Sequence, residues 1–266
     1  MATERPPSIM MGIGNTSVHA GLFTAAEMQQ PRDRLPQPTW HYRASVDQLD
    51  HDPFAACDLP TELAEVVVAS VNRDAYARIV QWIGQRYPQV VVRTLQYSDF
   101  PVALGQTEPA RVGTDRIAAA VAVNALRTQS RAAVFVDAGT ALTVNVIDPA
   151  GVFLGGAILP GIAVSLSTLS HATDQLPALS FRELAGASLP PVIGRNTEEA
   201  MRSGVFWGAV GAIRELSQQM AHQLEAPTEL FVTGGFGEPL AAALGGDAPF
   251  VPHLVLAGIA MAAGSA

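Results

Sequence analysis

One local pattern occurs twice in the 266-residue chain: an apolar strand, a glycine turn that carries a threonine, and a returning strand. The first copy, SIMM-GIGNTS-VHAGLF, holds Thr16, and the second, AAVFV-DAGT-ALTVNVI, holds Thr140. Each copy opens one of two halves of similar size, although so short a pattern also recurs by chance. We therefore expect an α/β protein of two lobes, residues 1–128 and 129–266.

Further elements follow from hydrophobic periodicity and from turn residues. We expect strands at 40–45, 63–70, 90–95, 151–158 and 230–233, and helices at 74–86, 114–127, 239–244 and 254–264.

The basic residues limit the chemistry, because the chain has no lysine and all 16 are arginine. A P-loop, a protein kinase and a Schiff-base enzyme each need a lysine in their usual form. If this chain handles ATP, glycine turns, backbone amides, hydroxyls, a metal and arginine must hold the phosphates.

The overall composition argues against several other classes of protein. The net charge of −8 disfavours nucleic acid as the main partner. Cys57 is the only cysteine, so we expect no intramolecular disulfide and no cysteine-based metal cage. The six histidines lack paired metal-ligand spacing. The opening residues do not resemble a signal peptide, and no apolar run of about 18 residues occurs, which predicts a cytoplasmic protein without a membrane partner.

Three glycine turns follow apolar strands, near Gly12, Asp137 and Gly234. Exposed amides in such turns can surround phosphate oxygens, and glycine lets the backbone approach closely. Each turn alone is also typical of an ordinary hairpin. The three together indicate a nucleotide site between the lobes.

Two aspartates are candidates for chemistry. Asp115 lies at a predicted helix start, where it complements the helix dipole without any further role, or acts as a general base beside Arg116. Asp137 ends a buried strand, where a carboxylate usually binds turn amides, a cation, or both.

A long helix is predicted from 197 to about 224. Asn196 is suited to cap it, with Glu199 three residues on to return the bond. Gly204, Gly208 and Gly211 lie near one helix face. This face indicates close packing on the sheet or, alternatively, a helix pair across a dimer.

These residues resemble a known family, the type III pantothenate kinases. The segments that carry the resemblance are GIGNTSVHAGLF, VVVASVN, PARVGTDR, VDAGTALTVNVID, GGAILPGIAVSLSTL, ATDQLP, IGRNTEEAMRSGVFWGAVGAI and VTGGFG, in the family's order and spacing. The resemblance implies two ribonuclease-H-like lobes with mixed sheets flanked by helices, as in acetate and sugar kinases, Hsp70 and actin. It also implies a homodimer that phosphorylates pantothenate with ATP, the first step towards coenzyme A.

The resemblance implies specific roles as well. Asp115 would be the catalytic proton acceptor, and Asp137 would hold a monovalent cation (K+ or NH4+), alongside Mg2+ on ATP. Pantothenate would contact Gln106, Gly113, Thr114, Asp115, Arg116 and, in the same or a partner subunit's site, Thr197. The nucleotide would contact Gly12, Ile13, Gly14, Asn15, Thr16, Ser17, Val18, His19, Thr140, Gly234 and Gly235.

The chain departs from the family pattern at three positions. Gly12 and Asn145 stand where the family has aspartates, and Gln106 where many members have a tyrosine. Losing a carboxylate that organises magnesium would cost several kcal/mol of transition-state stabilisation. Two alternatives therefore stand beside the kinase: a silent binding protein that senses nucleotide, pantothenate or a coenzyme A precursor, and a kinase for another small hydroxy acid.

Overall fold

The computed structural model describes residues 6–29, 34–49, 54, 59–106, 108–179, 189–246 and 248–265. Two compact units make up the chain: Met1–Leu126 with His253–Ala266, and Arg127–Pro252. The last helix belongs to the first unit, because it packs on helices and strands of that unit. Cys57 lies outside the described residues.

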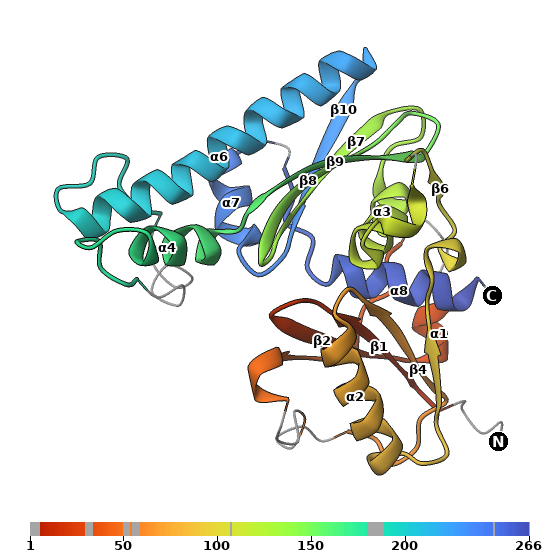
Figure 1. Cartoon of the computed structure of the whole chain (residues 1–266). Coiled ribbons are helices and arrows are strands. Elements are labelled where there is room, and N and C mark those ends of the chain that lie inside the picture. Colours follow the sequence, from red (N-terminus) through yellow and green to blue (C-terminus); the bar gives the residue numbers. More distant parts are fainter. Residues whose placement is uncertain are drawn as a thin grey trace. The chain divides into compact units, whose positions relative to one another are not determined.

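The first unit is built on a mixed sheet with the order β3-β2-β1-β4-β5. Figure 1 labels its central strands β2, β1 and β4. The pairs β1–β2 and β2–β3 are antiparallel, and β1–β4 and β4–β5 are parallel. The strands are β1 (Ser8–Ile13), β2 (Ser17–Phe23), β3 (Trp40–Ser45), β4 (Glu65–Ser70) and β5 (Val91–Thr94), with a short β6 (Ala103–Leu104).

Helices cover both faces of this sheet because the central strands β1 and β4 are apolar on both sides. Ile79 and Ile83 of α2 (Arg73–Arg86) pack with alternate residues of the two strands, such as Met11 and Val68. Helices α3 (Thr114–Leu126) and α8 (Leu254–Gly264) pack on each other and on the same strands. A Cβ at Gly258 of α8 would overlap the Ala118 carbonyl of α3, so a glycine is required for this close approach. The shorter helices are α1 (Ala25–Met28), η1 (Val46–Gln48), η2 (Tyr97–Asp99) and η3 (Pro109–Arg111).

The second unit has a sheet in which β10, β7, β8 and β9 lie in this order. The β10–β7 pair is parallel, while β7–β8 and β8–β9 are antiparallel. Alternate residues of β7 and β8, such as Val134 and Val144, form a core with Phe206, Val210 and Ile213 of α6. The strands are β7 (Ala132–Ala138), β8 (Ala141–Ile147), β9 (Val152–Pro160) and β10 (Thr228–Thr233), and the helices α4 (Ile162–His171), α6 (Thr197–Leu224) and α7 (Gly237–Leu244).

Helix α6 begins at the expected N-cap residue. Asn196 Oδ1 accepts a hydrogen bond from Glu199 N at 2.9 Å, and the Glu199 side chain accepts from the Asn196 side-chain amide Nδ2 at 3.0 Å and from Arg195 N at 2.8 Å. A Cβ built on Gly204, Gly208 or Gly211 would meet no atom within 4 Å. Close packing of these glycines on the sheet is therefore wrong, and the helix pair across a dimer stays a prediction.

The other expected strands and helices are present, with ends that shift by a few residues. Helix α4 was not expected. Within the described part of the chain, no helix combines the length and the apolar character needed to cross a membrane.

Candidate functional site

The first glycine turn joins β1 to β2 in the first unit. Gly14 N donates to Ser17 O at 2.9 Å, which closes the turn, and Thr16 O accepts from Val46 N at 3.0 Å, which ties it to the end of β3. Asn15 and Thr16 are exposed at its tip. The turn is thus a braced backbone loop with polar side chains pointing outward, as a phosphate site requires.

Gly12 lies just before this turn, on the side of β1 that faces α8. A Cβ built on it would lie 3.7 Å from Val255 Cγ1 and 3.9 Å from Ile259 Cδ1, at ordinary van der Waals distance. A side chain therefore fits at this position, against apolar neighbours. In this chain, Gly12 can contribute only its backbone atoms to a binding site.

His19 follows the first turn on β2 and belongs to a cluster of basic side chains. Its Nε2 lies 3.2 Å from Ser17 Oγ, and the rings of His41 and His253 are 4.2 Å apart. Loss of hydration lowers the pKa of His19 to about 4, and Arg43, His253 and His41 lower it further. Loss of hydration also lowers the pKa of His253, with His41 adding to the effect. Both shifts favour the neutral form of these two rings.

Asp115 lies in the first turn of α3 and is half-buried. Its Oδ1 accepts a hydrogen bond from Arg116 N at 2.8 Å, and a Cβ on Gly113 would lie only 2.5 Å from that oxygen. Burial raises the pKa of Asp115, while the Arg116 amide and guanidinium oppose the shift. A raised pKa brings a carboxylate closer to the range that suits a general base at neutral pH.

The end of β4 links Asp115 to the first glycine turn. Ser70 pairs with Ile13 of β1, and Val71 N donates to Ile13 O at 3.0 Å. On its other side, Ser70 O accepts from Thr114 Oγ1 at 3.2 Å. The structure thus places the first glycine turn and the Gly113–Arg116 segment at one edge of the same sheet. Ser70 and Val71 carry no chemical signature, and sequence reasoning gave them no part in the site.

The second glycine turn, in the second unit, joins β7 to β8. Gly139 N donates to Ala141 O at 3.1 Å, and Gly139 and Thr140 are exposed. The turn after β10 meets it: Phe236 N donates to Ala138 O at 3.1 Å, and a Cβ on Gly234 would lie 2.5 Å from Asp137 Oδ1. The adjacent parallel strands β7 and β10 explain this meeting, because their carboxyl ends share one edge of the sheet.

Gly234 has φ +93°, a backbone conformation that favours glycine. With Gly235 exposed beside it, the turn after β10 brings Gly234, Asp137 and Thr140 into one small region. The structure also adds Gly161, whose amide contacts this second turn and which sequence reasoning left without a role.

Asn145 lies on β8, and its side chain is fully buried. Its Nδ2 donates to Thr143 Oγ1 at 2.8 Å and more weakly to Phe135 O at 3.4 Å. A buried amide with partners stabilises the sheet interior. It does not add a charge to a phosphate or metal site.

The two implied cations differ in how well they fit. Asp137 supplies a half-buried carboxylate, and oxygen donors suit K+ or NH4+, so this residue is compatible with such a cation. A magnesium site made by the protein does not fit. The described residues contain no group of three or more histidine, cysteine, aspartate or glutamate side chains arranged to hold a metal, and Gly12 and Asn145 add no carboxylate.

Thr197 and Gln106 are the other two residues predicted to contact pantothenate. Thr197 is the first residue of α6 in the second unit and is exposed, while Gln106 is half-buried in a loop of the first unit.

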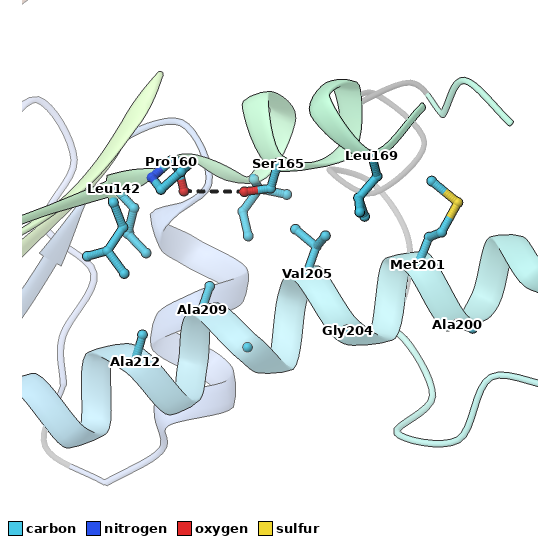
Figure 2. A pocket seen from close by; sticks show the side chains of 13 residues that line it. Leu142, Pro160, Ser165, Leu169, Ala200, Met201, Gly204, Val205, Ala209 and Ala212 are labelled. Carbon is cyan, nitrogen blue, oxygen red and sulfur yellow. Dashed lines mark hydrogen bonds between the residues drawn. The ribbon is translucent and has the colours of Figure 1, made fainter. Parts of the chain in front are cut away.

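An apolar groove of about 330 Å3 runs between α4 and α6 of the second unit. Figure 2 shows Val205 and Ala209 of α6 directed toward the groove, with Ser165 and Leu169 of α4 on its opposite side. Gly204 and Gly208 line the groove as well. Its one polar contact in that view is between Ser165 Oγ and Pro160 O, at 3.5 Å.

Comparison with known proteins covers most of the chain. A family model described as type III pantothenate kinase matches residues 8–219. A type III pantothenate kinase from Rhodopirellula baltica is 34% identical over 262 residues, which span 91% of this chain and 93% of the relative. One from Dehalococcoides mccartyi is 31% identical over 245 residues and 88% of each chain.

Solved structures with much lower sequence identity share the fold. The ethanolamine utilization protein EutJ from Carboxydothermus hydrogenoformans aligns with a TM-score of 0.55 at 15% identity, over 98% of this chain and 91% of that one. A propionate kinase from Francisella tularensis aligns with a TM-score of 0.50 at 11% identity, over 97% and 98%. These likenesses show the fold alone, an α/β fold shared over nearly the whole chain.

Proposed function

The chain belongs to the type III pantothenate kinase family, and from this premise we propose that it phosphorylates pantothenate to 4'-phosphopantothenate with ATP. The observation that carries the proposal is the position of Asp115, half-buried at the same sheet edge as the first glycine turn. That arrangement sets a proton acceptor beside a loop suited to phosphate.

In the proposed reaction, an Asp115 carboxylate oxygen accepts the proton of the pantothenate hydroxyl. The hydroxyl oxygen then forms a bond to the γ-phosphorus as the bond from that phosphorus to the β–γ bridging oxygen breaks, and ADP leaves. Arg116 N holds Oδ1 of Asp115 by a 2.8 Å hydrogen bond, which fixes the orientation of the carboxylate. Arg116 itself is suited to pair with the pantothenate carboxylate.

Positioning and charge neutralisation dominate phosphoryl transfer, so the phosphate-binding turns matter as much as the base. We assign the phosphates to the backbone of the first turn, with Asn15 and Thr16 at its tip, and to the second turn, with Thr140. The absence of lysine supports this assignment, since no ammonium group is available in their place. Gly234 and Gly235 are assigned to the adenosine side of the nucleotide.

The cations enter the proposal in different ways. Asp137 would hold K+ or NH4+, which adds a positive charge next to the second turn. Mg2+ enters as part of the MgATP substrate, because magnesium is commonly held by substrate phosphates with few protein ligands. Gly12 leaves that ion without a carboxylate from the first strand.

We also propose that the protein acts as a homodimer in the cytoplasm, with α6 at the interface. The glycine face of α6 is open, and exposed apolar side chains lie near it: Val192 is 70% exposed and Ile193 80% exposed, in a loop whose Val192 O accepts from Ser203 Oγ of α6. Thr197 is exposed at the start of this helix, where a partner's site could use it.

A second candidate function has specific support. Gly12 faces apolar atoms of α8, and the Asn145 side-chain amide is hydrogen-bonded to Thr143 inside the sheet. Neither position supplies the carboxylate that the family resemblance implies. A protein that binds nucleotide or pantothenate as a sensor, without transfer, fits that loss. Gln106 is the one feature that favours a kinase for another hydroxy acid.

Release of ADP by the purified protein, with MgATP, potassium and pantothenate, distinguishes these functions. Pantothenate-dependent release supports the kinase, and ligand binding without release supports the sensor. Release that requires a different hydroxy acid assigns another substrate. Omission of potassium tests the Asp137 assignment in the same assay.

A further inference from the structure

Gly161 lies between the end of β9 and the start of α4, and it touches the second glycine turn. Its backbone N donates to Thr140 O at 3.0 Å. A Cβ built on Gly161 would overlap the carbonyl oxygens of both Gly139 and Thr140. The segment before α4 and the tip of the turn are therefore in direct backbone contact.

A glycine is required at position 161 because a side chain would not fit there, and not because of its backbone conformation. Gly161 has φ −68° and ψ 167°, which any residue adopts, unlike the left-handed φ of +93° at Gly234. Pro160, just before it, is the last residue of β9 and pairs with Ala141 at the start of β8. The strand pairing thus places Gly161 next to the turn. The two backbones can come this close because Gly161 has no side chain.

The turn is supported from three sides. Gly139 N bonds to Ala141 O within the hairpin, Phe236 N bonds to Ala138 O from the β10 side, and Gly161 N bonds to Thr140 O from the α4 side. Of these three contacts, the one from Gly161 reaches Thr140 itself, the exposed residue assigned to the phosphates.

We propose that Gly161 is a positioning residue for nucleotide binding: its contact with the Gly139–Thr140 backbone fixes where Thr140 meets the phosphates. The inference rests on the nucleotide-binding part of the proposed function and does not depend on pantothenate being the substrate. Gly161 acts through the turn and touches no reacting atom.

The variant Gly161→Ala tests this directly, because the added methyl group must push the turn aside. A displacement of about 1 Å at a positioned group can lower activity about 100-fold. We expect a loss of that order in affinity for the magnesium complex of AMPPNP, measured by calorimetry, and in kcat/KM for ATP. The KM for pantothenate should stay at its wild-type value, since Gly113–Arg116 belong to the other unit.

Gly84→Ala is the matched control. Gly84 lies in α2 of the first unit, and a Cβ there would meet no atom within 4 Å. This variant adds the same methyl group and should keep wild-type nucleotide affinity. Thermal unfolding of both variants separates a local shift from a loss of fold.

Wild-type AMPPNP affinity in folded Gly161→Ala would overturn the inference. Equal losses toward AMPPNP and pantothenate, with a lowered melting temperature, would show a merely structural glycine and overturn it as well. If Gly161→Ala does not fold, Pro160→Gly decides, because it loosens the approach of Gly161 without adding an atom. It should weaken AMPPNP binding in the same direction by a smaller factor, and an unchanged affinity would contradict the inference.

The binding assay keeps this inference apart from the kinase proposal. A wild-type protein that binds AMPPNP but releases no ADP with pantothenate refutes the kinase alone, and the Gly161→Ala comparison still stands. A wild-type protein that binds no adenine nucleotide refutes both.

Discussion

At the scale of single residues, Asp115 and Gly12 define what the site can do. Asp115 keeps its hydrogen bond to Arg116 N and a pKa raised by burial, both suited to a proton acceptor. Gly12 has room for a side chain but no charged group. The setting of Asp115 therefore suits the proposed base, whereas Gly12 contributes no carboxylate to the proposed magnesium nucleotide site.

Asp115→Asn should lower turnover by about 100-fold to 10,000-fold, the usual contribution of a general base. Asparagine keeps the shape of the side chain and an oxygen for the Arg116 amide, so nucleotide affinity should change little. ADP release and AMPPNP calorimetry on the same preparation check both parts. Unaltered turnover would remove Asp115 from the catalytic role.

Gly12→Asp should raise the rate of phosphoryl transfer and tighten binding of magnesium nucleotide, because it adds a carboxylate just before the first glycine turn. A lower melting temperature should accompany the gain, since Val255 and Ile259 surround the new side chain. Gly12→Asn is the control of equal size without the charge and should give no gain. If Gly12→Asp folds and improves neither quantity, our interpretation of this position is wrong.

At the scale of elements, the strands were predictable and several contacts were not. β1, β7 and β8 are apolar runs bounded by glycine turns, a pattern that predicts strands directly. Helix α4 lacks charged residues and strong periodicity, so nothing marked it as a helix. The contacts of Ser70 with Thr114 and of Gly161 with Thr140 join segments distant in sequence through backbone atoms, which leave no residue-type signal.

Helix α2 offers a simple test of local stability at Gly84. The position is helical and open, so an alanine gains helix propensity without a clash. Gly84→Ala should raise the free energy of unfolding by about 0.5–1 kcal/mol. Urea unfolding followed by circular dichroism measures this, and a decrease would mean that the space around Gly84 is filled.

The glycine face of α6 tests the dimer proposal. Gly208→Leu adds a large side chain where the chain itself has no atom within 4 Å of a Cβ, so the fold should survive. We expect a shift from dimer to monomer, measured by light scattering after size-exclusion chromatography. Gly84→Leu, on α2, is the control and should leave the mass unchanged. A wild-type protein that is monomeric would exclude the dimer outright.

At the scale of the whole molecule, two features were not predicted from the sequence: the last helix belongs to the first unit, and histidines distant in sequence come together. The final helix is apolar around its whole circumference, which indicates burial without naming the partner. Its close approach to α3 through Gly258 explains its place in the first unit. Three of the six histidines, His19, His41 and His253, are distant in sequence and come together in the folded first unit.

This histidine cluster predicts how stability depends on pH. The pKa of His19 is lowered to about 4 from an ordinary value of 6.5, and that of His253 is lowered too. Between those values the unfolded chain binds more protons than the folded one, so stability is present above pH 6.5 and is lost as the pH falls toward 4. Part of the His19 side chain reaches solvent, which reduces the effect.

His19→Gln should flatten the dependence of melting temperature on pH between 6.5 and 4, relative to wild type. Asp115 acts in the opposite sense, because a raised pKa favours the folded state at low pH, so Asp115→Asn should steepen the same curve. An identical slope in wild type and His19→Gln would contradict the account of this cluster.

The central claim is that this chain transfers phosphate to pantothenate despite glycine at position 12. ADP release with MgATP and potassium, with and without pantothenate, tests it most directly, alongside Gly12→Asp. We predict pantothenate-dependent release by the wild-type protein and faster release by the variant. Release by the variant alone would contradict an active kinase and favour the sensor, and silence in both would contradict the assigned reaction.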